Sequence, residues 1–304
     1  MKRRSFIIKS LAASAFVTCS PVLSGCQPGL RGKRLVILHT NDMHSQIDPF
    51  TEGRNAGYGG MAARATAISK VRAVEDNVLL LDVGDVFQGT PYFNMFGGEL
   101  ELKLMSQMGY DATTVGNHEF DNGLDGLKRA IKHADFPYIN ANYDFSKNQM
   151  AGEVKPYKIF DKDGIKVGVF GLGIKLEGLV NPAMFDNTRY TDPIAVAKEM
   201  VQELHAKNCN LIVCLSHLGY DYGDAPYPSD VRLAQEVSEI DVILGGHTHT
   251  FMEQPLLLTN SQGFTTIINQ VGWAGINLGR IDVEFTESVK RIASSEVIML
   301  NNRV

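Results

Sequence analysis

The 304-residue sequence has few cysteines, few prolines and a single tryptophan. Of its four cysteines, Cys19 and Cys26 lie near the N-terminus, whereas Cys209 and Cys214 flank the apolar run 211–213. Two cysteines separated by this length of extended strand are too far apart to form a disulfide. The sequence therefore excludes a disulfide framework and a zinc site built from thiolates, and it assigns Cys209 and Cys214 to packing.

Long apolar runs, internal repeats and blocks of like charge are also absent. The chain has 29 basic and 34 acidic residues, and the first 25 residues hold four of the basic ones and none of the acidic ones. Without them 25 basic residues (29 − 4) face 34 acidic ones, a net charge of −9. Such a surface repels polyanions, which argues against a nucleic-acid polymer as partner. An anionic substrate then needs a local positive charge, for which a metal site is the obvious source.

The first 25 residues have the order of a secretory signal peptide: a basic start, a short apolar middle and small residues at the end. The pair Arg3 and Arg4 resembles a twin-arginine signal, and the run Leu-Ser-Gly before Cys26 resembles a bacterial lipobox. The apolar middle is too short for a membrane span. We therefore predict an exported lipoprotein, anchored through acylated Cys26 on the periplasmic or cell-surface side of a bacterial membrane, with a tether over 26–33.

Short apolar runs rich in β-branched residues alternate with amphipathic stretches along the rest of the chain. The predicted strands are 35–38, 78–83, 112–115, 138–140, 167–172, 211–215, 242–244, 265–268 and 281–285. The predicted helices are 61–74, 100–108, 124–133, 194–207 and 229–238. This alternation predicts an α/β fold with buried, largely parallel or mixed sheets. Because the last predicted strand ends near Phe285, we expect one domain over 34–287 and a C-terminal tail over 288–304.

Polar loops follow five of the predicted strands and, apart from His39 at the end of the first strand, carry five of the eight histidines. The five loops read His39-Thr-Asn-Asp-Met-His44, Asp82-Val-Gly-Asp85, Gly116-Asn-His-Glu-Phe-Asp121, Ser216-His-Leu-Gly-Tyr-Asp221 and Gly245-Gly-His-Thr-His249. In α/β sheets, ligands bind beyond the carboxyl ends of the strands. We therefore expect the five loops to converge on one crevice.

Seven side chains of these loops suit a pair of metal ions. They are Asp42, His44, Asp85, Asn117, His217, His247 and His249. Carboxylate, amide and imidazole ligands favour manganese, zinc, iron, cobalt or nickel over calcium. Seven ligands are too many for one ion, but a bridging Asp85 gives each of two ions four protein ligands. Because only two of the seven are anionic, two divalent ions keep a positive charge that attracts phosphate and acidifies a bound water.

Taken together, the five loops resemble the motifs of the calcineurin-like metallophosphoesterase superfamily. Within it they are similar to the catalytic domain of bacterial periplasmic 5′-nucleotidases, over roughly residues 34–287. The resemblance implies a sandwich of two β-sheets flanked by helices, with a dimetal site at the carboxyl ends of the strands.

The resemblance also implies a role for each site residue. It places Asp42, His44 and His249 on one metal, Asn117, His217 and His247 on the other, and Asp85 between them. It makes His118 and Asp121 a catalytic dyad. Their spacing supports this role, because His118 adjoins Asn117 and Asp121 lies within reach to fix the tautomer of its imidazole.

The neighbours of these residues carry weaker signals. We expect His39 to be packed behind the site. Asn41, Arg64, Asn140 and Asn142 could support the ligands or contact phosphate, but ordinary polar roles fit them equally well.

We therefore predict a hydrolase that cleaves phosphoesters of nucleotides or similar small monoesters by in-line attack of metal-bound hydroxide. Two-domain members of the resembling family bind the nucleoside with a C-terminal domain, so we expect a separate chain to supply that domain here. A phosphodiesterase or sulfur-ester hydrolase using the same metals remains an alternative. A non-catalytic, lipid-anchored binding protein is another, although the complete ligand set and the His118–Asp121 pair argue against it.

Overall fold

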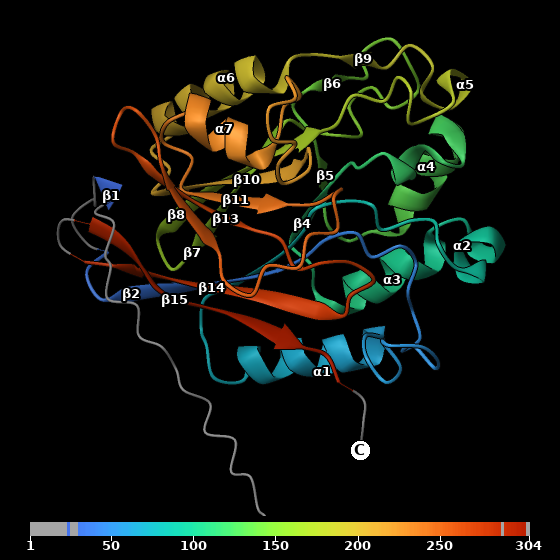
Figure 1. Ribbon diagram of the computed structural model, residues 1–304, viewed down its shortest axis with the longest axis horizontal. Coiled ribbons are helices and arrows are strands. Elements are labelled where there is room, and N and C mark those ends of the chain that lie inside the picture. The colour runs from blue at the N-terminus through green and yellow to red at the C-terminus, as the bar shows by residue number, and fades with distance from the viewer. Residues whose placement is uncertain (1–22, 25–29, 287–288, 302–304) are drawn as a thin grey trace, which may run out of the picture.

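The computed structural model describes residues 23–24, 30–286 and 289–301. Two β-sheets lie face to face, and helices cover their outer faces (Figure 1). Cys26 and most of the predicted signal peptide lie outside the described residues, so export and lipid anchoring stay predictions. Among the described residues, no helix is both long enough and apolar enough to cross a bilayer.

The first sheet has seven strands in the order β1-β15-β14-β2-β3-β4-β5. Their bounds are Leu23–Ser24 (β1), Val289–Met299 (β15), Asn277–Phe285 (β14), Lys33–Thr40 (β2), Val78–Asp82 (β3), Ala112–Thr114 (β4) and Tyr138–Ile139 (β5). Strands β2 to β5 run parallel, whereas β14 pairs antiparallel with β2 and with β15. The carboxyl ends of β2, β3 and β4 therefore meet at one edge.

The second sheet has six strands in the order β12-β13-β11-β10-β8-β7. Their bounds are Leu256–Thr259 (β12), Thr265–Asn269 (β13), Val242–Gly245 (β11), Leu211–His217 (β10), Ile165–Gly173 (β8) and Tyr157–Lys162 (β7). The four central strands are parallel and the two edge strands are antiparallel. A separate pair joins β6 (Tyr143–Asp144) to β9 (Arg189–Tyr190).

Seven α-helices and two short 3₁₀ helices are described in these ranges of the chain. The α-helices are Met61–Arg72 (α1), Pro91–Phe96 (α2), Glu99–Met108 (α3), Gly123–Ala130 (α4), Pro182–Phe185 (α5), Pro193–Ala206 (α6) and Asp230–Glu236 (α7), and the 3₁₀ helices are His118–Phe120 (η1) and Ile131–His133 (η2). Local sequence fixes several starts. The side chain of Asp192 accepts a hydrogen bond from the Ile194 amide at the start of α6, and Ser229 caps α7 in the same way.

Each central strand is buried on both faces, which explains why the sequence shows continuous apolar runs there rather than alternation. In β2, Leu35 and Ile37 pack in the core between the two sheets, whereas Val36 and Leu38 pack against α1 and α3. A third cluster lies between the second sheet and helices α6 and α7, and it includes Cys214. The predicted two-sheet α/β architecture is thus confirmed.

One expectation about the C-terminus is wrong. The last strand predicted from the sequence ends near Phe285, but Val289–Met299 forms β15, which pairs with β14 along its length with one register shift between Asp282 and Val283. The two edge strands of the second sheet were also missed. All three lie toward a sheet border and are partly exposed. β7 and β15 lack the continuous apolar run of a central strand, whereas β12 has a short run of three leucines that the prediction missed.

Candidate metal centre

The polar loops that follow β2, β3, β4, β10 and β11 meet at one end of the sandwich. Three of these strands are neighbours in the first sheet and two are neighbours in the second. Since all five run in the direction that brings their carboxyl ends together, loops distant in sequence contribute to one site. Two groups of side chains there could each hold a metal ion.

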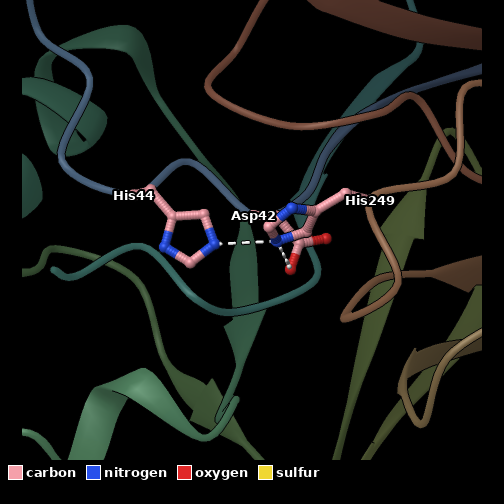
Figure 2. A group of neighbouring side chains, drawn as sticks. All are labelled: Asp42, His44 and His249. Carbon is pink, nitrogen blue, oxygen red and sulfur yellow. Dashed lines mark hydrogen bonds and ion pairs between the residues drawn. The ribbon is translucent and has the colours of Figure 1, made fainter. Parts of the chain in front are cut away.

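The first group consists of Asp42, His44 and His249, whose ligand atoms all lie within 4.8 Å of one another (Figure 2). The Nε2 atoms of His44 and His249 are 2.9 Å apart, and the Nε2 of His249 lies 3.5 Å from Oδ1 of Asp42. Asp42 is fully buried, whereas the side chain of His249 is 39% exposed. This group therefore opens toward solvent on the His249 side.

The second group consists of Asp85, His217 and His247. The Nε2 of His217 lies 3.0 Å from Oδ2 of Asp85 and 4.0 Å from Oδ1 of Asp42. Because Asp42 thus approaches both groups, the two groups adjoin. Asn117 joins this second group, with its Oδ1 2.9 Å from Nδ1 of His247. All seven side chains that the sequence suggests as ligands therefore lie together.

Most of these side chains project from strained backbone. Positive φ angles occur at Asp42 (50°), His44 (46°), Asp85 (52°), His247 (73°) and His249 (52°). The left-handed region costs a non-glycine residue roughly 1–2 kcal/mol. Such strain persists only where surrounding contacts hold it, and it concentrates at functional sites.

The buried charges of the centre favour a cation. Burial opposes the charged form of His217, but the Asp85 carboxylate outweighs it and raises the pKa of His217 to about 10. Burial likewise opposes ionisation of Asp85, yet His217 and the other imidazoles hold the pKa of that carboxyl well below its usual range. The Nε2 of His217 is buried without a hydrogen-bond partner although it faces Asp85. An imidazole nitrogen and a carboxylate oxygen that converge at this distance are donors that a divalent ion takes in proteins.

His118 and Asp121 lie at the mouth of the centre. The Nδ1 of His118 is 2.8 Å from Oδ2 of Asp121, and both side chains are about one-third exposed, at 33% and 30%. The backbone amide of His118 donates to Oδ1 of Asp85. Burial lowers the pKa of His118, but the contact with Asp121 and the charge of Asp85 raise it more, so the net shift is upward. The imidazole is thus favoured in its charged form beside the ligand groups.

Two further side chains fix the ligand loops. Glu119 is buried and accepts hydrogen bonds from the backbone amides of Asp85, Val86 and Gly116, which ties the loop after β3 to the loop after β4. Asn41 donates from Nδ2 to Oδ2 of Asp42, at 2.6 Å. Glu119 lies in the loop 116–121, but the sequence did not predict a function for it. A carboxylate that binds backbone amides has no distinctive spacing in a sequence.

The weaker sequence candidates have structural roles. His39 is buried between the sheets beside Asn269, as expected, and burial lowers its pKa to about 3. Asn140 accepts hydrogen bonds from the backbone amides of two following residues, and Asn142 bonds to the backbone of Gly173. Arg64 is buried beneath Gly275. Of this set, only Asn41 contacts a side chain of the two ligand groups through a hydrogen bond in the described part of the chain.

The family model for calcineurin-like phosphoesterases matches residues 35–251, which include all five loops. The chain belongs to this family. Members of the family use a dimetal site, and the two adjoining side-chain groups of this phosphoesterase-family chain agree with that requirement.

Named relatives are similar over nearly the whole chain. It is 35% identical to the snake venom 5′-nucleotidase of Gloydius brevicauda, over 89% of this chain and 48% of that protein. It is also 35% identical to the 5′-nucleotidase of Vibrio cholerae, over 98% of this chain and 58% of that protein. The crystal structure of a 5′-nucleotidase precursor from Thermus thermophilus superimposes with a TM-score of 0.78 at 32% identity, over 88% of this chain and 55% of that one. The chain thus spans about half the length of these relatives.

Proposed function

We propose that this chain is a metal-dependent phosphoesterase that releases phosphate from nucleotides or similar small phosphomonoesters. The observation that supports this most directly is the His118–Asp121 pair at the mouth of two adjoining ligand groups. In a binding protein with a degenerate centre, we would expect the dyad or some of the ligand side chains to have been lost. The names of the relatives, which are 5′-nucleotidases, support a nucleotide as substrate.

In this proposal the two ligand groups hold two divalent ions drawn from manganese, zinc, iron, cobalt and nickel. Asp42, His44 and His249 would hold one ion, Asn117, His217 and His247 would hold the other, and Asp85 would be shared between them. When bound, the ions supply positive charge for the phosphoryl oxygens and lower the pKa of a water ligand. The donor set of imidazoles, carboxylates and an amide suits these ions better than calcium.

In the proposed reaction, His118 of the dyad donates a proton to the leaving group. Because Nδ1 of His118 lies against the Asp121 carboxylate, Nδ1 carries a proton and donates it in a hydrogen bond. In the charged imidazolium, Nε2 also carries a proton and can donate it to the developing oxyanion. Asp121 holds the ring in this orientation and favours its charged form, which is the form that stabilises the leaving oxygen.

Two features of the proposal concern what lies around the catalytic domain. The 5′-nucleotidase relatives extend beyond the part that matches this chain, and we propose that a further domain, carried by this protein or by a second polypeptide, selects the nucleoside. The N-terminal pattern supports export and a lipid anchor at Cys26, which would place the centre on the periplasmic or cell-surface side.

The test combines metal analysis with a panel of esters. Protein expressed from residue 27 onward would be loaded with Mn²⁺, Zn²⁺ or Co²⁺, and phosphate release would be measured from nucleoside 5′-monophosphates, sugar phosphates, phosphodiesters and sulfur esters. We expect two ions per chain, turnover of monoesters, and loss of turnover with EDTA. Preference for diesters or sulfur esters would favour the alternative enzyme classes. A chain that binds two ions but cleaves nothing would favour the binding protein, and full selective nucleotide turnover by this chain alone would contradict the further domain.

A further inference from the structure

Trp273, the single tryptophan of the sequence, packs against both imidazoles of the first ligand group. Its ring is stacked on His249, with centroids 5.7 Å apart and an interplanar angle of 6°. It also meets His44 in an edge-on contact, at 6.4 Å and 63°. Phe50 contacts the same indole at 5.9 Å. None of the metal-binding patterns in the sequence includes this residue.

The two histidines that Trp273 contacts lack the support that metal-binding histidines usually have. Such histidines generally bond their second ring nitrogen to a fixed partner, which sets the orientation of the ring. In the second group, Nδ1 of His217 lies 2.7 Å from the carbonyl oxygen of Val83. By contrast, Nδ1 of His44 is buried without a partner. Within the described ranges, no hydrogen bond fixes Nδ1 of His249 either.

His249 needs this support more than the other ligands do. Its side chain is 39% exposed, whereas those of Asp42 and His217 are fully buried. An exposed imidazole on a loop loses rotamer freedom when it binds a metal, and that loss weakens binding unless the ring is already held. The parallel face of Trp273 holds it, because a ring stacked on an indole cannot rotate without losing the contact.

Trp273 is itself tied to the loop that carries the first ligand. The backbone amide of Ala274 donates to the carbonyl oxygen of Asp42, at 2.7 Å. The side chain of Asn41 accepts from the Val271 amide and donates to the carbonyl oxygen of Gly272. The segment 271–274 therefore moves with Asp42, and the indole is presented to His249 in a fixed relation to it.

We propose that Trp273 is a positioning residue that holds the imidazoles of His249 and His44 in place of hydrogen bonds and so sets the affinity of the first metal site. The proposal rests on the metal centre of the proposed function but not on which ester is cleaved. It predicts that only the affinity of the first site depends on Trp273. The second group has its own hydrogen-bonded support and does not contact the indole.

Equilibrium dialysis of the metal-free chain against Co²⁺ or Mn²⁺ tests this without measuring activity. We expect Trp273→Leu to weaken one of the two sites about tenfold or more while the other keeps its affinity. Trp273→Phe keeps an aromatic face and should recover most of the loss, which a purely structural defect would not allow. Phe50→Leu is the matched control, since Phe50 contacts the indole from the edge, and it should change neither affinity by more than about threefold.

The wild-type chain offers an independent readout, because all tryptophan fluorescence comes from Trp273. Co²⁺ bound beside the indole should quench it, and His249→Ala should shift the quenching midpoint to about tenfold higher Co²⁺. The proposal is overturned if Trp273→Leu leaves both affinities unchanged, or if it weakens both sites equally. A wild-type chain that binds two ions with these properties yet hydrolyses no ester would contradict the proposed function alone.

Discussion

His118 and Asp121 form a hydrogen bond of 2.8 Å across a single turn of the 3₁₀ helix η1. The turn begins at Asn117, a residue of the second ligand group, so the backbone that places a ligand also places the dyad. Because the His118 amide donates to Asp85, the orientation of the imidazole is coupled to a carboxylate of the second ligand group. The geometry of the ligand groups and the proposed proton transfer therefore depend on the same short segment.

The dyad can be separated from metal binding by substitution. We expect His118→Ala to lower kcat by about 10²–10⁴-fold, the range for loss of a general acid, while metal content stays at two ions per chain. Asp121→Asn should cause a smaller loss in the same direction, because the amide removes the negative charge but keeps the size. Steady-state kinetics with metal analysis of each variant checks this. Loss of metal from His118→Ala would assign it a ligand role instead.

Substitution of Asp85, unlike substitution of the dyad, should remove metal binding together with turnover. Asp85 is the carboxylate that approaches both His217 and the dyad, so Asp85→Ala should weaken metal binding by about 10²-fold or more and remove turnover with it. Asp125→Ala, which changes an exposed carboxylate on α4, is the matched control and should retain both. Metal content measured after dialysis decides the matter: an Asp85→Ala chain that still holds two ions is inconsistent with a bridging ligand.

Central strands and ligand loops could be predicted from the sequence for one physical reason. A strand buried on both faces is apolar over most of its length, as β3 is from Val78 to Leu81, and the polar residues that begin at Asp82 stand out. The residues that hold the site were harder to predict. Trp273 acts through ring packing, and Glu119 acts through backbone amides, so neither leaves a spacing that distinguishes it from an ordinary core or loop residue.

The C-terminal strand shows a different limit. The segment 289–299 pairs with β14, which precedes it in the sequence. Polar residues interrupt its apolar ones, and it carries no motif, so neither hydrophobicity nor a motif identifies it as a strand. Its place depends on tertiary contacts, including that of one buried lysine, Lys290. Contacts of this kind appear only once the two sheets are assembled.

Gly116 offers a test of how tightly the ligand loops approach one another. A Cβ built at this residue would lie 2.2 Å from Oδ1 of Asp85 and 2.8 Å from Cε1 of His217. Because Gly116 does not have a positive φ, alanine there is opposed by crowding of the ligands alone. We expect Gly116→Ala to weaken metal binding about tenfold or more.

Gly178→Ala is a control that introduces backbone strain without crowding the ligands. Gly178 has a φ of +92° and no atom within 4 Å of an added Cβ. This substitution should lower the free energy of unfolding by about 1–2 kcal/mol without changing metal affinity. Calorimetric unfolding of the metal-free chains and dialysis against Mn²⁺ measure both quantities. Equal metal affinity in the two variants would mean that the loop after β4 can shift to make room for the added methyl group.

Lys290 links β15 to the opposite sheet. Its Nζ lies 2.5 Å from Oδ2 of Asp241 and 3.0 Å from the carbonyl oxygen of Asn210, and both Lys290 and Asp241 are buried. Lys290→Ala would leave the Asp241 carboxylate buried without its counter-charge, which typically costs about 3–5 kcal/mol. For a domain of this size we expect the melting temperature to fall by about 10 °C.

Replacing both charges isolates the cause of that loss. Lys290→Met combined with Asp241→Leu removes the ion pair without leaving a buried charge, and it should recover most of the stability. Metal content should be unaffected in either variant, because the pair lies at the opposite ends of β10 and β11 from the ligand loops. If the double variant is no more stable than Lys290→Ala, then β15 is held by the lysine itself rather than by neutralisation of Asp241.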